Sequence, residues 1–244
     1  MKILVINPNT TETMTTKIAL AAKTAVSSGV DVFAVNPHFG PESIQGYLDE
    51  ALCLNGLLKL VYQNTNYDAF VIACFDDTGL DAARCLTNKP VIGIGEAAFH
   101  MASLISNRFS VVTTLPRSIS AIEHNLDKYG LAKRCARVRA ANVAVLDLEH
   151  SGSDACLKIR GEIRSAIRED GCDAIVLGCA GMTDLAKSLQ IEFGLPVLDG
   201  VACALAMAES TARLGLQTSQ AGAYSSAGQK IPKDWQPCSE RLTA

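Results

Sequence analysis

The sequence predicts an α/β fold of two pseudo-symmetric Rossmann-like lobes, each with a four-stranded parallel sheet, and a ligand site in the cleft between them. Two observations support this prediction. Short apolar runs alternate with helix-like segments along the chain, and the pattern repeats after about 105 residues. With 244 residues, of which 48% are hydrophobic, the chain is long enough to bury such a core.

Eight apolar segments have the length and β-branched composition of strands buried on both faces. They span residues 2–8, 30–37, 69–74, 90–95, 109–114, 136–143, 174–179 and 196–200. Helix-like segments separate them, at residues 10–27, 46–63, 96–106, 116–129, 153–169, 182–192 and 200–214. This alternation is typical of βαβ units with right-handed crossovers.

Three segments of the first half have counterparts 105 to 107 residues further on. The pairs are YDAFVIAC (67–74) with CDAIVLGC (172–179), KPVIGIGEAAFHMA (89–102) with LPVLDGVACALAMA (195–208), and ILVINPNT (3–10) with SVVTTLPR (110–117). Two copies of one four-strand unit explain these matches. We expect residues 1–96 plus 208–244 to form the first lobe and 97–207 the second.

Composition and charge exclude several classes of function. The net charge is −3 and the basic residues are scattered, so neither a nucleic-acid nor a membrane surface is expected, and the predicted partner is a small molecule. The chain shows neither a signal peptide nor a membrane span, which predicts a cytoplasmic protein. Nine dispersed cysteines without CxxC spacing argue against disulfides and a metal site, and no cofactor motif is present.

Cys74 and Cys179 occupy matching places at the ends of two repeated strands. In open α/β sheets ligands bind beyond the carboxyl ends of the strands, so two facing lobes bring both thiols to one cleft. Each cysteine precedes a helix-like segment, whose N-terminus stabilises a thiolate. One thiol on each face of a carbon acid is the arrangement that 1,1-proton transfer requires. Asn7, Thr113 and Thr114, at the ends of the matching first strands, are candidates to stabilise the enolate oxygen.

The blocks ILVINPNT, GPESIQGYLDEA (40–51), VIACFDDTGL and IVLGCAGM resemble the hydantoin racemase branch of the aspartate/glutamate racemase superfamily. The resemblance extends to about residue 215. It implies two pseudo-symmetric lobes, assembly into homo-oligomers, and racemisation of 5-substituted hydantoins, a class that includes allantoin. The reaction proceeds by deprotonation at ring carbon 5, without a cofactor.

The resemblance also implies roles for particular residues. Cys74 and Cys179 match the two acid/base cysteines. The positions that match substrate contacts are Asn7, Thr113 and Thr114 for ligand oxygens, Phe39 and Ile44 for the 5-substituent, and the backbone N–H groups of Phe75, Ala180 and Gly181 for the ring carbonyls.

This chain departs from the branch after its first cysteine, where Phe75-Asp76-Asp77-Thr78 replaces Gly-Asp-Pro. The bulkier and more acidic segment favours a polar 5-substituent, such as the ureido group of allantoin. The Cys-Asn-Thr and Cys-Thr-His segments of the amino-acid racemases are absent, which disfavours free aspartate or glutamate as substrate.

Alternatives remain at this stage. The same fold supports a decarboxylase, which needs one cysteine, or a cis-trans isomerase, which forms a covalent adduct; a non-catalytic binding protein is a third possibility. Asn7 and Asn9 are equally explained as turn and cap residues, Thr113 and Thr114 as sheet-edge residues, and Asp76 or Asp77 as a helix cap.

The remaining cysteines are interpreted as packing residues, except Cys238, which falls in a polar tail that starts at Ser219. None of the four histidines has an obvious catalytic partner. The tail lacks helical periodicity and is either disordered or an arm that packs on a neighbouring subunit. Trp235 favours some docking, because an isolated exposed tryptophan is unusual.

Overall fold

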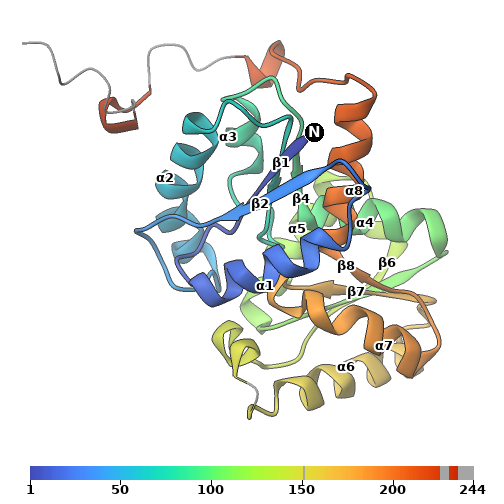
Figure 1. The fold of residues 1–244 in the computed structure, drawn as a ribbon. Coiled ribbons are helices and arrows are strands. Elements are labelled where there is room, and N and C mark those ends of the chain that lie inside the picture. The colour runs from blue at the N-terminus through green and yellow to red at the C-terminus, as the bar shows by residue number, and fades with distance from the viewer. Residues whose placement is uncertain (151, 226–230, 236–244) are drawn as a thin grey trace, which may run out of the picture.

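The computed structural model describes residues 1–150, 152–225 and 231–235. They form two four-stranded parallel sheets with helices packed against them (Figure 1). The predicted α/β class and the two pseudo-symmetric sheets are therefore confirmed.

The first sheet has the strand order β2-β1-β3-β4. Its strands are β1 (Lys2–Ile6), β2 (Asp31–Val35), β3 (Ala69–Ile72) and β4 (Val91–Gly93). In the central strand, Ile3 pairs with Val32 on one side and Ala69 on the other. Ile3, Leu4, Val5 and Ile6 are fully buried, which explains why the sequence of β1 shows no alternation.

The second sheet has the equivalent order β6-β5-β7-β8. Its strands are β5 (Phe109–Thr113), β6 (Cys135–Ala140), β7 (Ala174–Gly178) and β8 (Val197–Asp199). Each strand takes the place in its sheet that its repeat partner takes in the other. The internal repeat is thus a repeat of a whole four-strand unit, and the order places the carboxyl ends of β1, β3, β5 and β7 centrally.

Helices follow the strands as predicted. The α-helices are α1 (Glu12–Lys23), α2 (Tyr47–Gln63), α3 (Leu80–Arg84), α4 (Ile94–Ile105), α5 (Ile119–Lys128), α6 (Ala155–Glu169), α7 (Ala186–Phe193) and α8 (Gly200–Arg213). Short 3-10 helices are η1 (Pro116–Ser118), η2 (Ala132–Arg134), η3 (Val145–Glu149), η4 (Ala180–Leu185), η5 (Gly222–Tyr224) and η7 (Lys233–Trp235). The segment predicted as one helix over 182–192 is divided between η4 and α7.

Helices α4 and α8 cross from one lobe to the other. Helix α4 follows the first sheet but packs on β7 and β8, whereas α8 follows the second sheet and packs on β1, β3 and β4. The two helices also pack on each other, and a Cβ at Gly200 would lie 2.7 Å from the carbonyl oxygen of Ile94. Only glycine permits this close approach. The predicted boundaries between the lobes, at residues 96/97 and 207/208, therefore lie inside α4 and α8.

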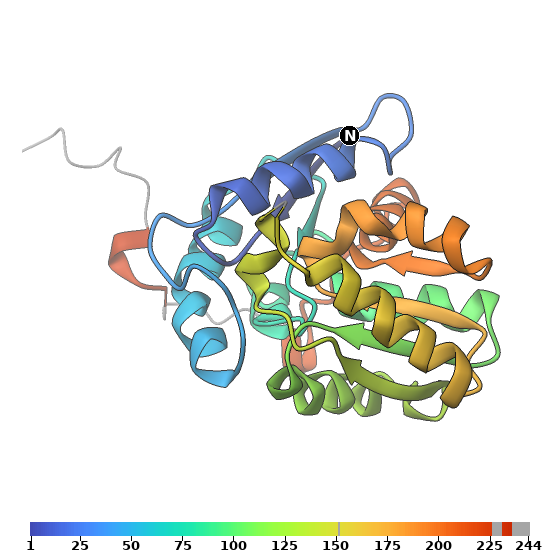
Figure 2. The ribbon, with the colours of Figure 1, turned by 90° about the horizontal axis from the view of Figure 1, so that it is seen from below.

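One buried core joins the lobes. It includes Val5 of the first sheet, Val111 of the second, Phe99 of α4 and Leu205 of α8, all with no exposed surface. Separate cores cover the outer faces, under α2 and α3 in the first lobe and under α6 and α7 in the second. Figure 2 shows α6 lying across the strands of the second sheet. Because the shared core fixes the sheets relative to each other, groups at their strand ends are held across one cleft.

The C-terminal segment docks on its own chain at Trp235. The indole is 5% exposed, and its Nε1 donates a hydrogen bond to Asn55 Oδ1 (3.0 Å) on α2. Gln63 Nε2 donates to the Trp235 carbonyl (2.9 Å), and the Tyr62 ring lies beside the indole. The predicted docking of Trp235 is confirmed, with α2 of the same chain as its partner (Figure 1). Cys238 lies outside the described residues.

No helix in the described part of the chain is long and apolar enough to cross a bilayer.

Candidate active site

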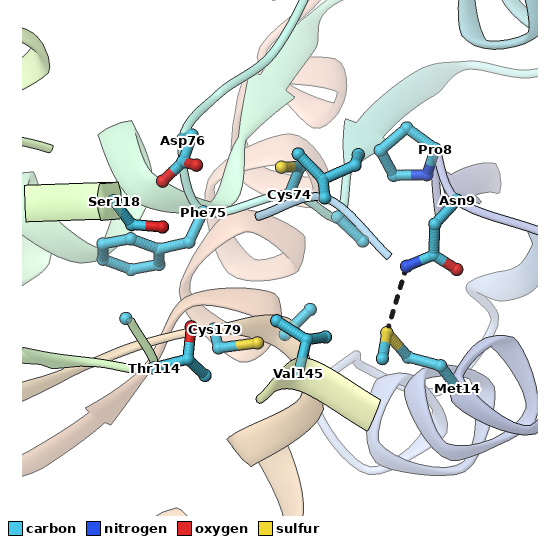
Figure 3. Close-up of a pocket in the computed structure, with 14 residues that line it drawn as sticks. Pro8, Asn9, Met14, Cys74, Phe75, Asp76, Thr114, Ser118, Val145 and Cys179 are labelled. Atoms are coloured by element: carbon cyan, nitrogen blue, oxygen red, sulfur yellow. Dashed lines mark hydrogen bonds between the residues drawn. The ribbon is translucent and has the colours of Figure 1, made fainter. Parts of the chain in front are cut away.

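A cleft opens between the two lobes, at the ends of β1, β3, β5 and β7. Cys74 and Cys179 line it from opposite sides, one from each sheet (Figure 3). The predicted meeting of the two thiols at a single cleft is therefore present in the structure.

Cys74 lies in a tight turn after β3. Its carbonyl accepts the N–H of Asp77 (3.0 Å), and its Sγ lies 3.4 Å from Thr78 Oγ1. The side chain is 9% exposed, so the thiol is accessible only from the cleft. Asp77 has φ of 50°, in the left-handed region that turns of this kind use and that aspartate tolerates better than most residues.

Cys179 follows β7 directly and precedes η4. Its carbonyl accepts the N–H of Met182 (3.1 Å), and the Gly181 N–H is hydrogen-bonded to its sulfur. The preceding residue must be glycine, because a Cβ at Gly178 would lie 2.8 Å from the Cβ of Thr113. Close packing between β5 and β7 thereby sets the position of the second thiol.

Each cysteine turn is held by a helix of the opposite lobe. On the first lobe, Asn125 Nδ2 of α5 donates to the Asp76 carbonyl (2.8 Å), and the Tyr129 hydroxyl donates to Asp77 Oδ2 (2.8 Å). On the second lobe, Lys17 Nζ of α1 donates to the Leu148 carbonyl (3.0 Å) and lies 3.5 Å from the Gly181 carbonyl. Helices α1 and α5 occupy equivalent places in the repeat, so the two clamps are related by the same pseudo-symmetry.

Burial governs the ionisation of both thiols. Burial raises the pKa of Cys179 to about 11. The hydrogen bond from the Gly181 N–H and the positive charge of Lys17 lower this pKa but do not offset the effect of burial. Burial also raises the pKa of Cys74 well above its usual range, and the carboxylate of Asp76 adds to this. The helix N-terminus expected to stabilise a thiolate does not follow Cys74, because a turn separates it from α3. Both thiols are consequently favoured in their protonated form near neutral pH.

The two aspartates after Cys74 have different surroundings. Asp77 is fully buried beneath the cleft, and its carboxylate accepts the backbone N–H groups of Gly95 (3.0 Å) and Glu96 (2.7 Å). It therefore caps α4, not the helix that follows it in sequence. A Cβ at Gly95 would lie 2.8 Å from Asp77 Oδ2, which explains the glycine. Asp76 lines the cleft itself, and burial raises its pKa to about 7, with the charges of Glu50 and Asp77 adding to the effect.

The structure separates the predicted substrate contacts into two groups. Ile44, Phe75, Thr114 and Ala180 line the cleft with the two cysteines. Gly181 lies beneath Cys179, where its N–H reaches the sulfur. These positions suit the contacts that the resemblance implies.

Three predicted contacts lie elsewhere. Asn7 is behind the cleft wall and donates to Asn9 Oδ1 (2.9 Å), while Thr113 donates to the Gly178 carbonyl (2.9 Å) inside the second lobe. Phe39 is 88% exposed and lies over a separate surface hollow beside Leu52 of α2. Asn7 and Thr113 thus support cleft residues from behind, and Phe39 does not reach the thiols.

Other lining residues were not identified as substrate contacts from the sequence. They are Pro8, Asn9, Met14, Ala73, Asp76, Ser118, Val145 and Gly178. Asn9 turns its amide toward the cleft and donates to Met14 Sδ (3.3 Å), as the dashed line in Figure 3 shows. Asn9 and Asp76 are polar residues of the kind that bind substrates, but their positions in the sequence are explained equally well by helix capping. Ser118 and Val145 carry no sequence signal at all, because they reach the cleft only through the packing of the second lobe.

Among the described residues, no group of three or more His, Cys, Asp or Glu side chains is arranged to hold a metal ion. The chemical groups that face the cleft are two thiols, a carboxylate, hydroxyls and an amide. This donor set suits acid/base chemistry on a neutral polar molecule.

The family model described as Asp/Glu/Hydantoin racemase matches residues 3–208. The chain belongs to this family. A hydantoin racemase from Pseudomonas sp. (strain NS671) is 45% identical to it over 226 residues, which cover 92% of this chain and 91% of the relative. The family membership predicted from the cysteine blocks is confirmed.

Solved structures of the same family superpose on the whole fold. An allantoin racemase from Klebsiella pneumoniae has a TM-score of 0.92 and 45% identity, covering 94% of this chain and 95% of its own. An allantoin racemase from Pseudomonas fluorescens has a TM-score of 0.91 and 38% identity, covering 95% and 99% respectively. This chain therefore shares its fold with both allantoin racemases.

Proposed function

We propose that this protein racemises 5-substituted hydantoins, with allantoin as its substrate, by proton transfer between ring carbon 5 and the thiols of Cys74 and Cys179. The observation that supports this best is the pair of cysteines that line one cleft from opposing sheets. A carbon atom bound between them has one thiol on each face, as inversion requires.

The reaction needs one thiolate and one thiol. The thiolate removes the proton from carbon 5, and the electron pair of that C–H bond passes into the ring, placing negative charge on the adjacent carbonyl oxygen. The opposite thiol then gives its proton to the other face of the carbon. The substrate leaves as its mirror image, and the thiolate and thiol have exchanged places.

Burial tunes the thiols for this task. A thiolate formed in a water-poor cleft is a stronger base than one in water, since its pKa is higher, and a stronger base is better matched to a weakly acidic C–H bond. The N–H groups of Phe75 and Ala180 and the hydroxyl of Thr114 are the proposed donors to the ring oxygens. Asn7 and Thr113 contribute indirectly, by holding Asn9 and Gly178.

Two features support allantoin over hydantoins with apolar substituents. Two solved structures that superpose on most of this chain are named allantoin racemases. The cleft also contains Asp76 and Ser118, which provide hydrogen-bonding groups that an alkyl or aryl substituent would leave unpaired.

The test follows optical rotation of single-enantiomer allantoin and 5-benzylhydantoin in heavy water, while NMR monitors deuterium at carbon 5 against an enzyme-free control. Enzyme-dependent loss of rotation with deuterium uptake is expected, faster for allantoin. Absence of acceleration with both compounds would overturn the proposal. A substrate-dependent mass increase on Cys74 would instead indicate a covalent isomerase, and ligand binding without turnover would indicate a binding protein.

A further inference from the structure

The cleft has one acidic end. In Figure 3 Asp76 lies near Ser118 on one side of the thiols, whereas Asn9 and Met14 lie on the other. The backbone of Asp76 is fixed from the opposite lobe, because its carbonyl accepts a hydrogen bond from Asn125. Its carboxylate accepts no hydrogen bond from any described residue. A carboxylate that faces a cleft and receives no hydrogen bond from the protein is available to a ligand.

A second carboxylate adds to this end. Glu50 lies in the first turn of α2, and its charge acts on Asp76. Its Oε1 is buried and has no hydrogen-bond partner among the described residues. The charges that raise the pKa of Asp76 are those of Glu50 and Asp77, both acidic, and neither Asp76 nor Glu50 forms an ion pair with a described residue, although the Arg117 side chain lies beside Gly46 at the start of α2. Burying unpaired carboxylates is costly, and a ligand with N–H groups removes part of that cost.

We propose that Asp76, with Glu50 behind it, determines specificity by accepting hydrogen bonds from N–H groups on the 5-substituent of the substrate. This inference depends on the proposed racemase function, which it extends to the choice of substituent. A ureido group presents several N–H donors to such an acceptor, whereas alkyl and aryl groups present none. A substituent that itself ends in a carboxylate is repelled by the same pair.

The chemistry explains why discrimination should be large. Above its raised pKa of about 7 the Asp76 carboxylate is ionised, and hydrogen bonds to an ionised acceptor are stronger than neutral ones. A substrate that lacks the donors leaves the carboxylate desolvated and unpaired, and sites built in this way reject the wrong substrate strongly. Asp76 therefore disfavours hydantoins with apolar substituents, because they leave its carboxylate desolvated and unpaired.

The experiment compares substrate ratios in matched variants. For wild type, Asp76→Ala, Asp76→Asn and Asp154→Ala, kcat/KM is measured with allantoin, 5-benzylhydantoin and hydantoin-5-acetic acid. Asp154 is an exposed residue before α6 and serves as the carboxylate control. Asp76 also acts on the pKa of both thiols, but that effect is common to all substrates and cancels in the ratio.

In Asp76→Ala the ratio of kcat/KM for allantoin to that for 5-benzylhydantoin is expected to fall roughly 10- to 100-fold. Turnover of hydantoin-5-acetic acid should rise. Asp76→Asn keeps a hydrogen-bond acceptor but loses the charge, so its kcat/KM ratio should lie between those of wild type and Asp76→Ala. The ratio for Asp154→Ala should match that of wild type.

An equal loss of kcat/KM for allantoin and 5-benzylhydantoin in Asp76→Ala would overturn the inference. Asp76 would then act on the hydantoin ring or on the thiols, which all the substrates share, and not on the 5-substituent. If Asp76→Ala does not fold, Asp76→Asn and the wild-type preference against hydantoin-5-acetic acid provide the test. A wild-type protein that racemises no hydantoin refutes the proposed function, whereas an active protein with an unchanged ratio refutes only this inference.

Discussion

The two cysteine turns occupy equivalent places in the repeat but differ in charge. The turn after β3 carries Asp76 and Asp77 and places acidic groups beside Cys74. The turn after β7 has Ala180 and Gly181 instead, and a backbone N–H reaches the sulfur of Cys179. Duplication of the fold therefore supplied the two faces of the site, and substitution in one turn made those faces unequal.

The side chains that hold the two turns also differ in charge. Lys17 lies close enough to lower the pKa of Cys179, whereas the turn of Cys74 is held by the neutral side chains of Asn125 and Tyr129. Loss of a proton is consequently easier at Cys179 than at Cys74. We expect the Cys179 thiolate to be the base that begins the reaction from one enantiomer, with Cys74 as the acid.

The largest expected effect comes from removing either thiol. Cys74→Ser and Cys179→Ser should each lower racemisation by about 100- to 10,000-fold, because one face of the carbon loses its acid or base. Each variant should retain exchange of the carbon-5 proton for one enantiomer only, and the two variants should prefer opposite enantiomers. NMR in deuterated buffer measures this. Cys156→Ser on α6, far from the cleft, is the control, and racemisation near wild-type rates in both cleft variants would contradict the two-base mechanism.

A second, smaller effect should follow from Lys17→Met. Removing the cation raises the pKa of Cys179, so less thiolate forms at any pH below that value, and kcat/KM should fall about three- to tenfold. The ascending limb of the pH–rate profile, along which the Cys179 thiolate forms, should move to higher pH. Lys23→Met, an exposed lysine of the same helix, provides the comparison. Identical pH profiles for the two variants would show that the charge of Lys17 does not act on the reaction.

Tyr129→Phe should act on stability more than on chemistry. Burial raises the pKa of Asp77 to about 7, above its unfolded value, so its protonated form is favoured in the native state. This contribution is fully present below about pH 4 and is lost as the pH rises through 7. Because the Tyr129 hydroxyl lowers this pKa, its removal should cost about 1 kcal/mol at pH 5 and about 2 kcal/mol at pH 8.5.

Urea unfolding at both pH values measures this cost. Tyr224→Phe is the matched control, since its hydroxyl donates to Asp81 (2.9 Å), whose side chain is 48% exposed. It should be less destabilising and less dependent on pH. A Tyr129→Phe cost that is greater at pH 5 than at pH 8.5 would refute the assignment.

The smallest effect is expected at Phe39. Its side chain is 88% exposed and outside the cleft, so Phe39→Ala should change kcat/KM less than about twofold. Ile44→Ala removes a buried residue that lines the cleft, and it should reduce kcat/KM more for every substrate tested. A larger effect at Phe39 than at Ile44 would reverse this order and place the substituent nearer the surface hollow.

Much of the fold was predictable because the signals were local and occurred twice. All eight strands lie where apolar runs predict them, and the signal is clearest for strands inside the sheets, such as β3, β5 and β7, which are buried along their whole length. The meeting of Cys74 and Cys179 was predictable for a related reason, because parallel strands at equivalent positions end at equivalent places. The exposed position of Phe39 was not predictable, because the course of the loop after β2 depends on packing against α2.

The sequence by itself determined the α/β class, the duplicated unit and the cysteine at the end of each repeated strand, because periodicity and repetition are properties of the chain. The tertiary structure decided the rest. Exchange of α4 and α8 between lobes fixed how the sheets face each other, and that arrangement brought Ser118 and Val145 to the cleft. It also decided that Asp77 is buried as a cap while its neighbour Asp76 faces the substrate space, since two adjacent carboxylates differ only in what surrounds them.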